Sequence, residues 1–129
     1  MRRSAPRIQE FQTKEGTGWV RAFAAYYLGF KRTCSLEDAC TLPVLSSEVE
    51  RAGDTARASY EQQMKQIFEL MAKHLPDDAA SSSTEKAYAL MALLAGGALL
   101  ARTVLDPELS AQIAAAVEAH ALRLTESAS

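Results

Sequence analysis

The side chains that could carry catalysis are few and scattered along the chain. Glu37 and Asp38 are adjacent carboxylates in a polar segment, a setting that favours solvated surface groups over a general acid/base pair. His74 and His120 each stand alone, and a single histidine does not make a metal site. We therefore predict no enzymatic activity, no cofactor and no bound metal.

The two cysteines, Cys34 and Cys40, lack the spacing of a redox or zinc motif. Free thiols in a reducing cytoplasm are the favoured interpretation, because disulfides are rare in that compartment. A redox pair in a small helical enzyme is the weaker alternative, since neither cysteine belongs to a Cys-x-x-Cys arrangement at a helix start. The basic N-terminus has no apolar run behind it, so it is not a signal peptide, and we expect a cytoplasmic protein.

Length and charge further restrict the class of protein to which the chain can belong. The chain has 129 residues and a formal net charge of −2, which suits one domain with a sizeable core. Its lysines and arginines are scattered, and this argues against a phosphate-binding surface for nucleic acid.

Large aromatic and methionine side chains form a more informative set. They recur at helical spacing, which is typical of ordinary core, but such side chains also line apolar ligand cavities. The tyrosines favour a cavity slightly, because a buried phenol needs a polar partner that a ligand can supply. The set comprises Trp19, Phe23, Tyr26, Tyr27, Phe30, Met64, Phe68, Met71, Tyr88 and Met91.

The stretch from Ala87 to Ala101 carries no charge and is apolar on every side. At about 1.5 Å per residue it is too short to span a bilayer comfortably. A helix of this kind can instead bury one side in its own domain and the other in a partner. Gly96 and Gly97 lie in its middle, where glycine costs up to about 1 kcal/mol relative to alanine, and this favours the close approach of another backbone.

The elements that position these residues are all helical, because no stretch alternates with period two. Ser82 and Glu85 have capping-box spacing, and Asp106 followed by Pro107 is typical of a helix start. We predict a tail or connecting segment over residues 1–17 and one helical domain over 18–126. Its helices are expected at about 18–31, 42–52, 54–75, 83–105 and 107–124.

The last two predicted helices carry many small residues, among them Ala92, Gly96, Ala116 and Ala121. Small residues allow two helix axes to approach closely. Tight packing inside one monomer would use them in this way. A two-fold partner is the favoured alternative, because the central helix has no polar face to present to water.

The order of these parts resembles the C-terminal half of the TetR family of transcriptional regulators. The run CTLPVLSSEV, from Cys40 to Val49, is similar to a segment with the pattern Cys-Pro/Thr-Leu-x-x-Leu-x-x-Glu-Val/Leu found in many members. The apolar helix with its Gly-Gly pair, followed by DPELS from Asp106 to Ser110, is similar to the family's last two helices. The resemblance extends from about Trp19 to Leu124.

The resemblance implies a five-helix bundle whose last two helices form a four-helix interface in a homodimer, and a small apolar effector among the earlier helices. It makes interface candidates of Ala92, Gly96, Leu99, Thr103, Ile113, Val117, His120 and Leu124. It makes pocket candidates of Phe23, Tyr27, Leu42, Leu45, Met64, Phe68, Met71, Tyr88 and Met91.

The family's helix-turn-helix domain needs three helices, whereas only about 17 residues precede the first predicted helix here. We therefore expect DNA binding only through a domain that is not part of this chain, and no membrane contact. The resemblance implies the sensing and dimerisation half of a repressor. The alternative is a free-standing helical dimer or adaptor that binds no ligand and uses its aromatic side chains as core.

Overall fold

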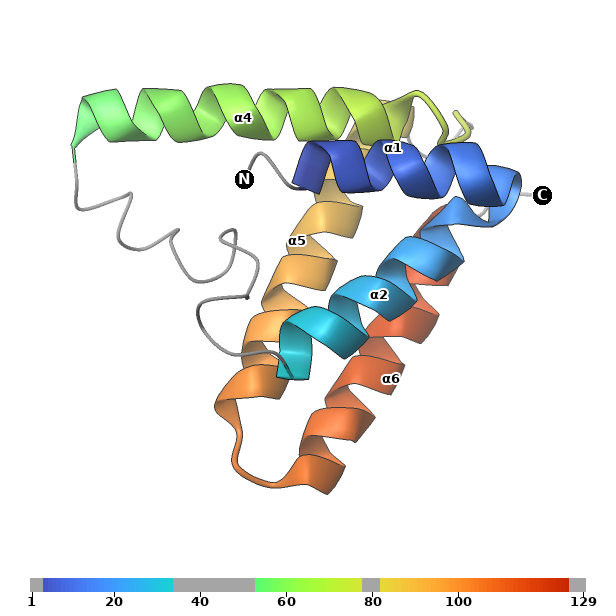
Figure 1. Ribbon diagram of the computed structural model, residues 1–129, viewed down its shortest axis with the longest axis vertical. Helices are drawn as coiled ribbons and strands as arrows, with labels where there is room; N and C mark the ends of the chain where they lie inside the picture. The colour runs from blue at the N-terminus through green and yellow to red at the C-terminus, as the bar shows by residue number, and fades with distance from the viewer. Residues whose placement is uncertain (1–3, 34–52, 78–81, 126–129) are drawn as a thin grey trace.

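The computed structural model describes residues 4–33, 53–77 and 82–125, and in these ranges the chain is all-α (Figure 1). No strand occurs within them, which confirms the predicted fold class. The elements are α1 (Ser4–Glu15), a 3₁₀ turn (Gly16–Gly18), α2 (Trp19–Thr33), α4 (Asp54–Ala72), α5 (Ser83–Thr103) and α6 (Pro107–Thr125). The helix predicted at about 42–52 lies outside the described residues.

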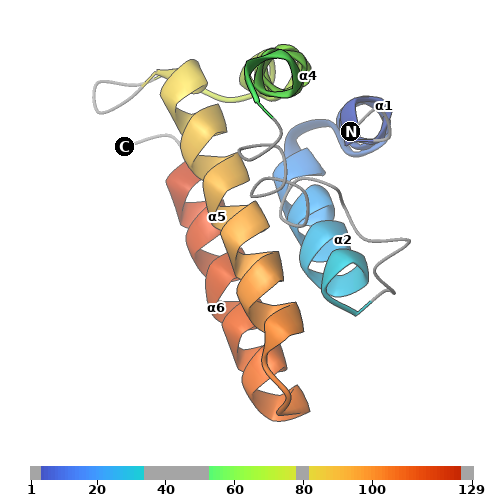
Figure 2. The same cartoon turned by 90° about the vertical axis from the view of Figure 1, so that its left-hand side faces the viewer.

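The helices form two sets. Helices α5 and α6 run antiparallel as a hairpin, and α2 packs against both of them (Figures 1 and 2). Helices α1 and α4 lie side by side across one end of this group, with α1 on α2 and α4 on α5. In Figure 2 the other face of the α5–α6 hairpin carries no described element.

The segment predicted to be a tail is instead helix α1. Ile8 is fully buried, and Phe11 packs edge-on against Phe23 of α2, with ring centroids 5.8 Å apart. Ile8, Phe11 and Gln12 have helical spacing, but too few apolar residues surround them for the sequence to predict an amphipathic helix. Contacts with α2 and α4 stabilise α1, so residues 4–15 of the predicted tail or connecting segment form a helix that packs on the domain.

The predicted start of α5 is confirmed. The hydroxyl of Ser82 accepts the N–H of Glu85, and the Glu85 carboxylate accepts the N–H of Ser82, each at 3.1 Å. At the start of α6 the Asp106 carboxylate accepts the N–H of Glu108 at 3.0 Å. At α4 the N-cap is Gly53, and Asp54 is the first residue of the helix.

The core is apolar and draws on all five helices. Trp19, Phe23 and Tyr27 of α2 are its largest buried side chains from the N-terminal half. Leu90, Leu94 and Ala98 face it from α5. Helices α5 and α6 are in close contact at Gly97, where an added Cβ would lie 2.7 Å from Cγ1 of Val117. The close approach predicted at the Gly-Gly pair therefore falls on Gly97 within one protomer, and Val117 is the residue that requires it.

We predict that Gly97→Ala lowers the free energy of unfolding by about 1–3 kcal/mol, because overpacking against Val117 exceeds the helix propensity gained. In the double variant Gly97→Ala/Val117→Ala the new methyl group occupies the space that the valine leaves. The double variant should then be more stable than the sum of the two single effects predicts. Urea unfolding of all four proteins measures this coupling, and strictly additive effects would contradict the proposed contact.

Candidate functional site

The predicted interface residues of α5 form one exposed stripe. Ala92, Gly96, Leu99 and Thr103 follow one another at spacings of three or four, so they share a face of the helix, and all are exposed. This face lies opposite the buried side chains of the same helix. Leu99 and Leu100 are 42% and 60% exposed, which leaves apolar side chains on the surface of the hairpin.

The residues of α6 that were predicted to form the dimer interface lie along its contact with α5. Ile113, Val117 and Leu124 are half-buried, and Val117 contacts Gly97 of the same protomer. His120 is exposed, and its Nδ1 lies 2.9 Å from the carbonyl oxygen of Ala116. Because a carbonyl only accepts, Nδ1 carries the proton in this bond and Nε2 remains for other contacts.

Four of the predicted pocket residues lie in the core. Phe23, Tyr27, Met71 and Met91 are at most 3% exposed, and the rings of Phe23 and Tyr27 pack against each other with centroids 5.8 Å apart. A side chain that lines a cavity large enough for a small molecule presents surface to water-sized solvent. These four side chains present almost none, so an effector that contacts them requires them to move apart.

Three other pocket candidates lie closer to the surface, where α4 meets α5. Met64 and Phe68 are half-buried on α4, and Tyr88 of α5 is 52% exposed. The rings of Phe68 and Tyr88 meet edge to face with centroids 4.9 Å apart. Leu42 and Leu45, the remaining candidates, lie outside the described residues.

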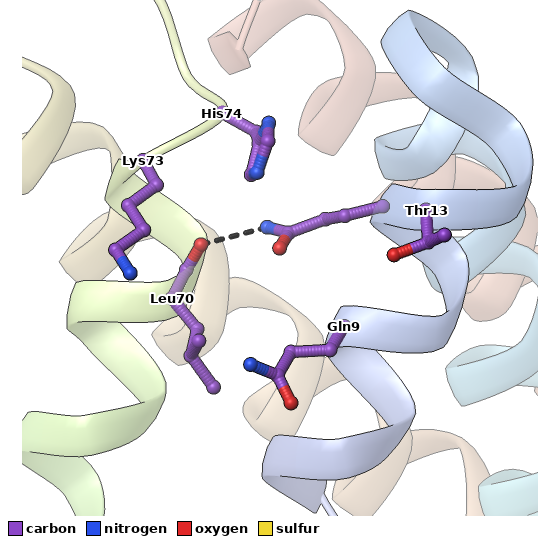
Figure 3. Close-up of a pocket in the computed structure, with 6 residues that line it drawn as sticks. Gln9, Thr13, Leu70, Lys73 and His74 are labelled. Atoms are coloured by element: carbon purple, nitrogen blue, oxygen red, sulfur yellow. Dashed lines mark hydrogen bonds between the residues drawn. The ribbon is translucent and has the colours of Figure 1, made fainter.

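The structure also has a groove that the sequence analysis did not predict. It lies between α1 and the C-terminal end of α4, with a volume of about 340 Å³ (Figure 3). Gln9, Gln12 and Thr13 line it from α1, and Leu70, Lys73 and His74 line it from α4 and the turn that follows. No pattern in the sequence indicates this groove, because its α1 residues belong to the predicted tail or connecting segment.

Two hydrogen bonds hold the walls of this groove together. The last turn of α4 tightens, because the N–H of His74 donates to the carbonyl of Met71 instead of that of Leu70. The free Leu70 carbonyl accepts the side-chain amide of Gln12 at 2.7 Å, which Figure 3 marks with a dashed line. The His74 carbonyl accepts the indole N–H of Trp19 at 3.0 Å. Side chains of α1 and α2 thus satisfy carbonyls that the end of α4 leaves open.

The groove offers hydrogen-bond donors and positive charge. No carboxylate lines it, and Lys73 forms no ion pair with any residue that the structure describes. No group of three or more metal-binding side chains occurs in the described parts of the chain.

Comparison with models of protein families, with curated proteins and with solved structures finds no match to this chain. Within residues 4–33, 53–77 and 82–125, none of the helices has the length and apolar character needed to cross a membrane.

We predict that Gln12→Met lowers the free energy of unfolding by about 1–3 kcal/mol. Methionine keeps the length of the side chain but removes the donor, so the Leu70 carbonyl loses its partner at the end of α4. Gln9→Met is the matched control, because Gln9 is exposed on the same helix, and its effect should stay within about 0.5 kcal/mol. Equal effects in urea unfolding would show that the Gln12 bond does not hold α4.

Proposed function

We propose that this chain is the effector-sensing and dimerisation domain of a TetR-like transcriptional repressor of the cytoplasm, and that it forms a homodimer through α5 and α6. The observation that carries the proposal is the uncovered face of the α5–α6 hairpin (Figure 2). From Tyr88 to Leu100 this face of α5 contains no charged residue. A second copy is the partner of matching chemistry, since an isologous interface brings the same apolar stripe from both sides.

Gly96 supports a close contact between the two copies. An added Cβ at Gly96 would have no atom within 4 Å, so this glycine leaves open space at the surface of the protomer. A helix of the partner can approach the backbone there, as small residues allow. Gly97 packs against Val117 of the same protomer, whereas the space beside Gly96 can accept a second chain.

The proposed mechanism couples a small apolar effector to the dimer through α5. Met64 and Phe68 of α4 and Tyr88 of α5 form the apolar surface that an effector would reach first. Because α5 carries both Tyr88 and the interface stripe, an effector that favours one position of α5 changes the arrangement of the two protomers. In this proposal DNA is contacted by helix-turn-helix domains that the dimer holds at a fixed spacing.

A second candidate function is a free-standing helical dimer or adaptor that binds no ligand. The burial of Phe23, Tyr27, Met71 and Met91 favours it, because these side chains fill the core as an adaptor requires. Both candidates use the α5–α6 surface, and they differ only in the effector.

We predict that the chain elutes as a dimer of about twice 14.0 kDa in size-exclusion chromatography with light scattering at micromolar concentration. Gly96→Leu should shift it toward the monomer, because the new side chain fills the space that the partner helix needs. Ala25→Leu is the control, since it adds the same side chain at an exposed position of α2. A wild-type monomer, or a Gly96→Leu protein that remains a dimer, would overturn the proposed interface.

The effector is tested with 1-anilinonaphthalene-8-sulfonate, a fluorescent apolar probe. We predict a saturable increase in its emission with the wild-type dimer, and a smaller one with Phe68→Gln, because the apolar surface between α4 and α5 is reduced. Leu109→Gln, which removes an exposed leucine at the start of α6, should leave the signal unchanged. An equal signal in Phe68→Gln and wild type would favour the adaptor.

A further inference from the structure

The groove between α1 and the end of α4 differs in chemistry from the proposed effector surface. Five of its six lining residues are polar, and Leu70 is the exception. An apolar molecule would bury the amide of Gln9 and the hydroxyl of Thr13 without giving them hydrogen-bond partners, which costs free energy. A polar ligand avoids this cost.

The charges around the groove favour an anion. Lys73 is exposed on the α4 side and lies within ion-pair distance of no described carboxylate. Asp77, which follows α4, does not line the groove, and its carboxylate accepts the N–H of Ser83 at 2.6 Å. Glu69, one turn before Lys73, and Glu10 on α1 do not line the groove.

The position of the groove limits how much negative charge it accepts. It lies at the C-terminal end of α4, where helix carbonyls carry partial negative charge. Helix N-termini and arginine side chains are favourable phosphate sites, and neither lines this groove. A single carboxylate is less strongly repelled, and its two oxygens can accept hydrogen bonds from several donors at once.

The volume of the groove limits the size of the ligand beyond its carboxylate group. Its volume of about 340 Å³ is at the lower end of the range for small-molecule sites. Leu70 is half-buried at its floor, and Figure 3 shows Gln9 reaching toward it from α1. A short aliphatic chain would lie against Leu70 while the head group meets the donors.

We propose that this groove binds a small monocarboxylate with a short aliphatic chain, at a site separate from the apolar effector surface. The carboxylate lies between Lys73 and His74 on one side and Gln9 and Thr13 on the other. Binding adds a link between α1 and α4 next to the two hydrogen bonds that already join α4 to the N-terminal helices. The ligand therefore stabilises the folded chain, and Trp19, the only tryptophan, reports on it through its bond to His74.

Sodium butyrate is the probe, and butyramide is its neutral counterpart of nearly the same shape. Titration of the full chain at constant ionic strength, followed by Trp19 emission and by the melting temperature, should give saturable binding of butyrate at millimolar concentration. Butyramide should not bind. Lys73→Met should weaken butyrate binding about tenfold or more, whereas Lys73→Arg should retain it.

Lys65→Met is the matched control, because Lys65 is an exposed lysine of the same helix that pairs with Glu61 at 3.6 Å, outside the groove. It should leave the affinity unchanged. Absence of saturable butyrate binding, equal binding of butyramide, or equal affinity in Lys73→Met would each overturn the proposal. Inorganic phosphate that binds as tightly as butyrate would overturn the assignment to carboxylates. The oligomeric state of Lys73→Met should equal that of wild type, so failure here is distinct from failure of the proposed dimer.

Discussion

The organisation of this protein depends on a helix that has no polar side to present to water. Between Lys86 and Arg102, α5 carries no charge. Removing any side of this helix from water is therefore favourable. Helices α2, α4 and α6 cover one half of it, and its contact with α6 is close enough to require Gly97 opposite Val117. The uncovered half, with Leu99 and Leu100 on it, is the basis of the proposed dimer.

A second constraint on the fold is that the backbone carbonyls at the C-terminal end of α4 need hydrogen-bond donors. A helix that stops beside the core leaves carbonyls without partners, and such groups are costly when they are shielded from water. Here Gln12, which is 7% exposed, and Trp19, which is 1% exposed, donate to the carbonyls of Leu70 and His74. These bonds fix where α1 and α2 meet α4, and the groove is the space that remains beside them.

The two proposed ligand surfaces differ because their surroundings differ. Phe68 and Tyr88 meet as rings where α4 and α5 pack together, which suits an apolar molecule. Five residues after Phe68, Lys73 and His74 lie opposite the polar side of α1, which suits an anion. One helix therefore connects both surfaces, and its position relative to α5 is what either ligand would stabilise.

The sequence by itself determined the helical class and most helix limits, because these depend on local chemistry. Ser82 with Glu85 and Asp106 with Pro107 mark helix starts through bonds between neighbouring residues, and the uncharged stretch of α5 is visible without a structure. Only the tertiary structure decided that residues 4–15 form a helix, because Ile8 and Phe11 are stabilised by contacts with α2 and α4 far along the chain. It also decided which of two adjacent glycines packs against Val117, and it brought Gln12 beside Leu70 to form the groove. Spacing along one helix shows which residues share a face, whereas the partner of that face depends on how the helices pack.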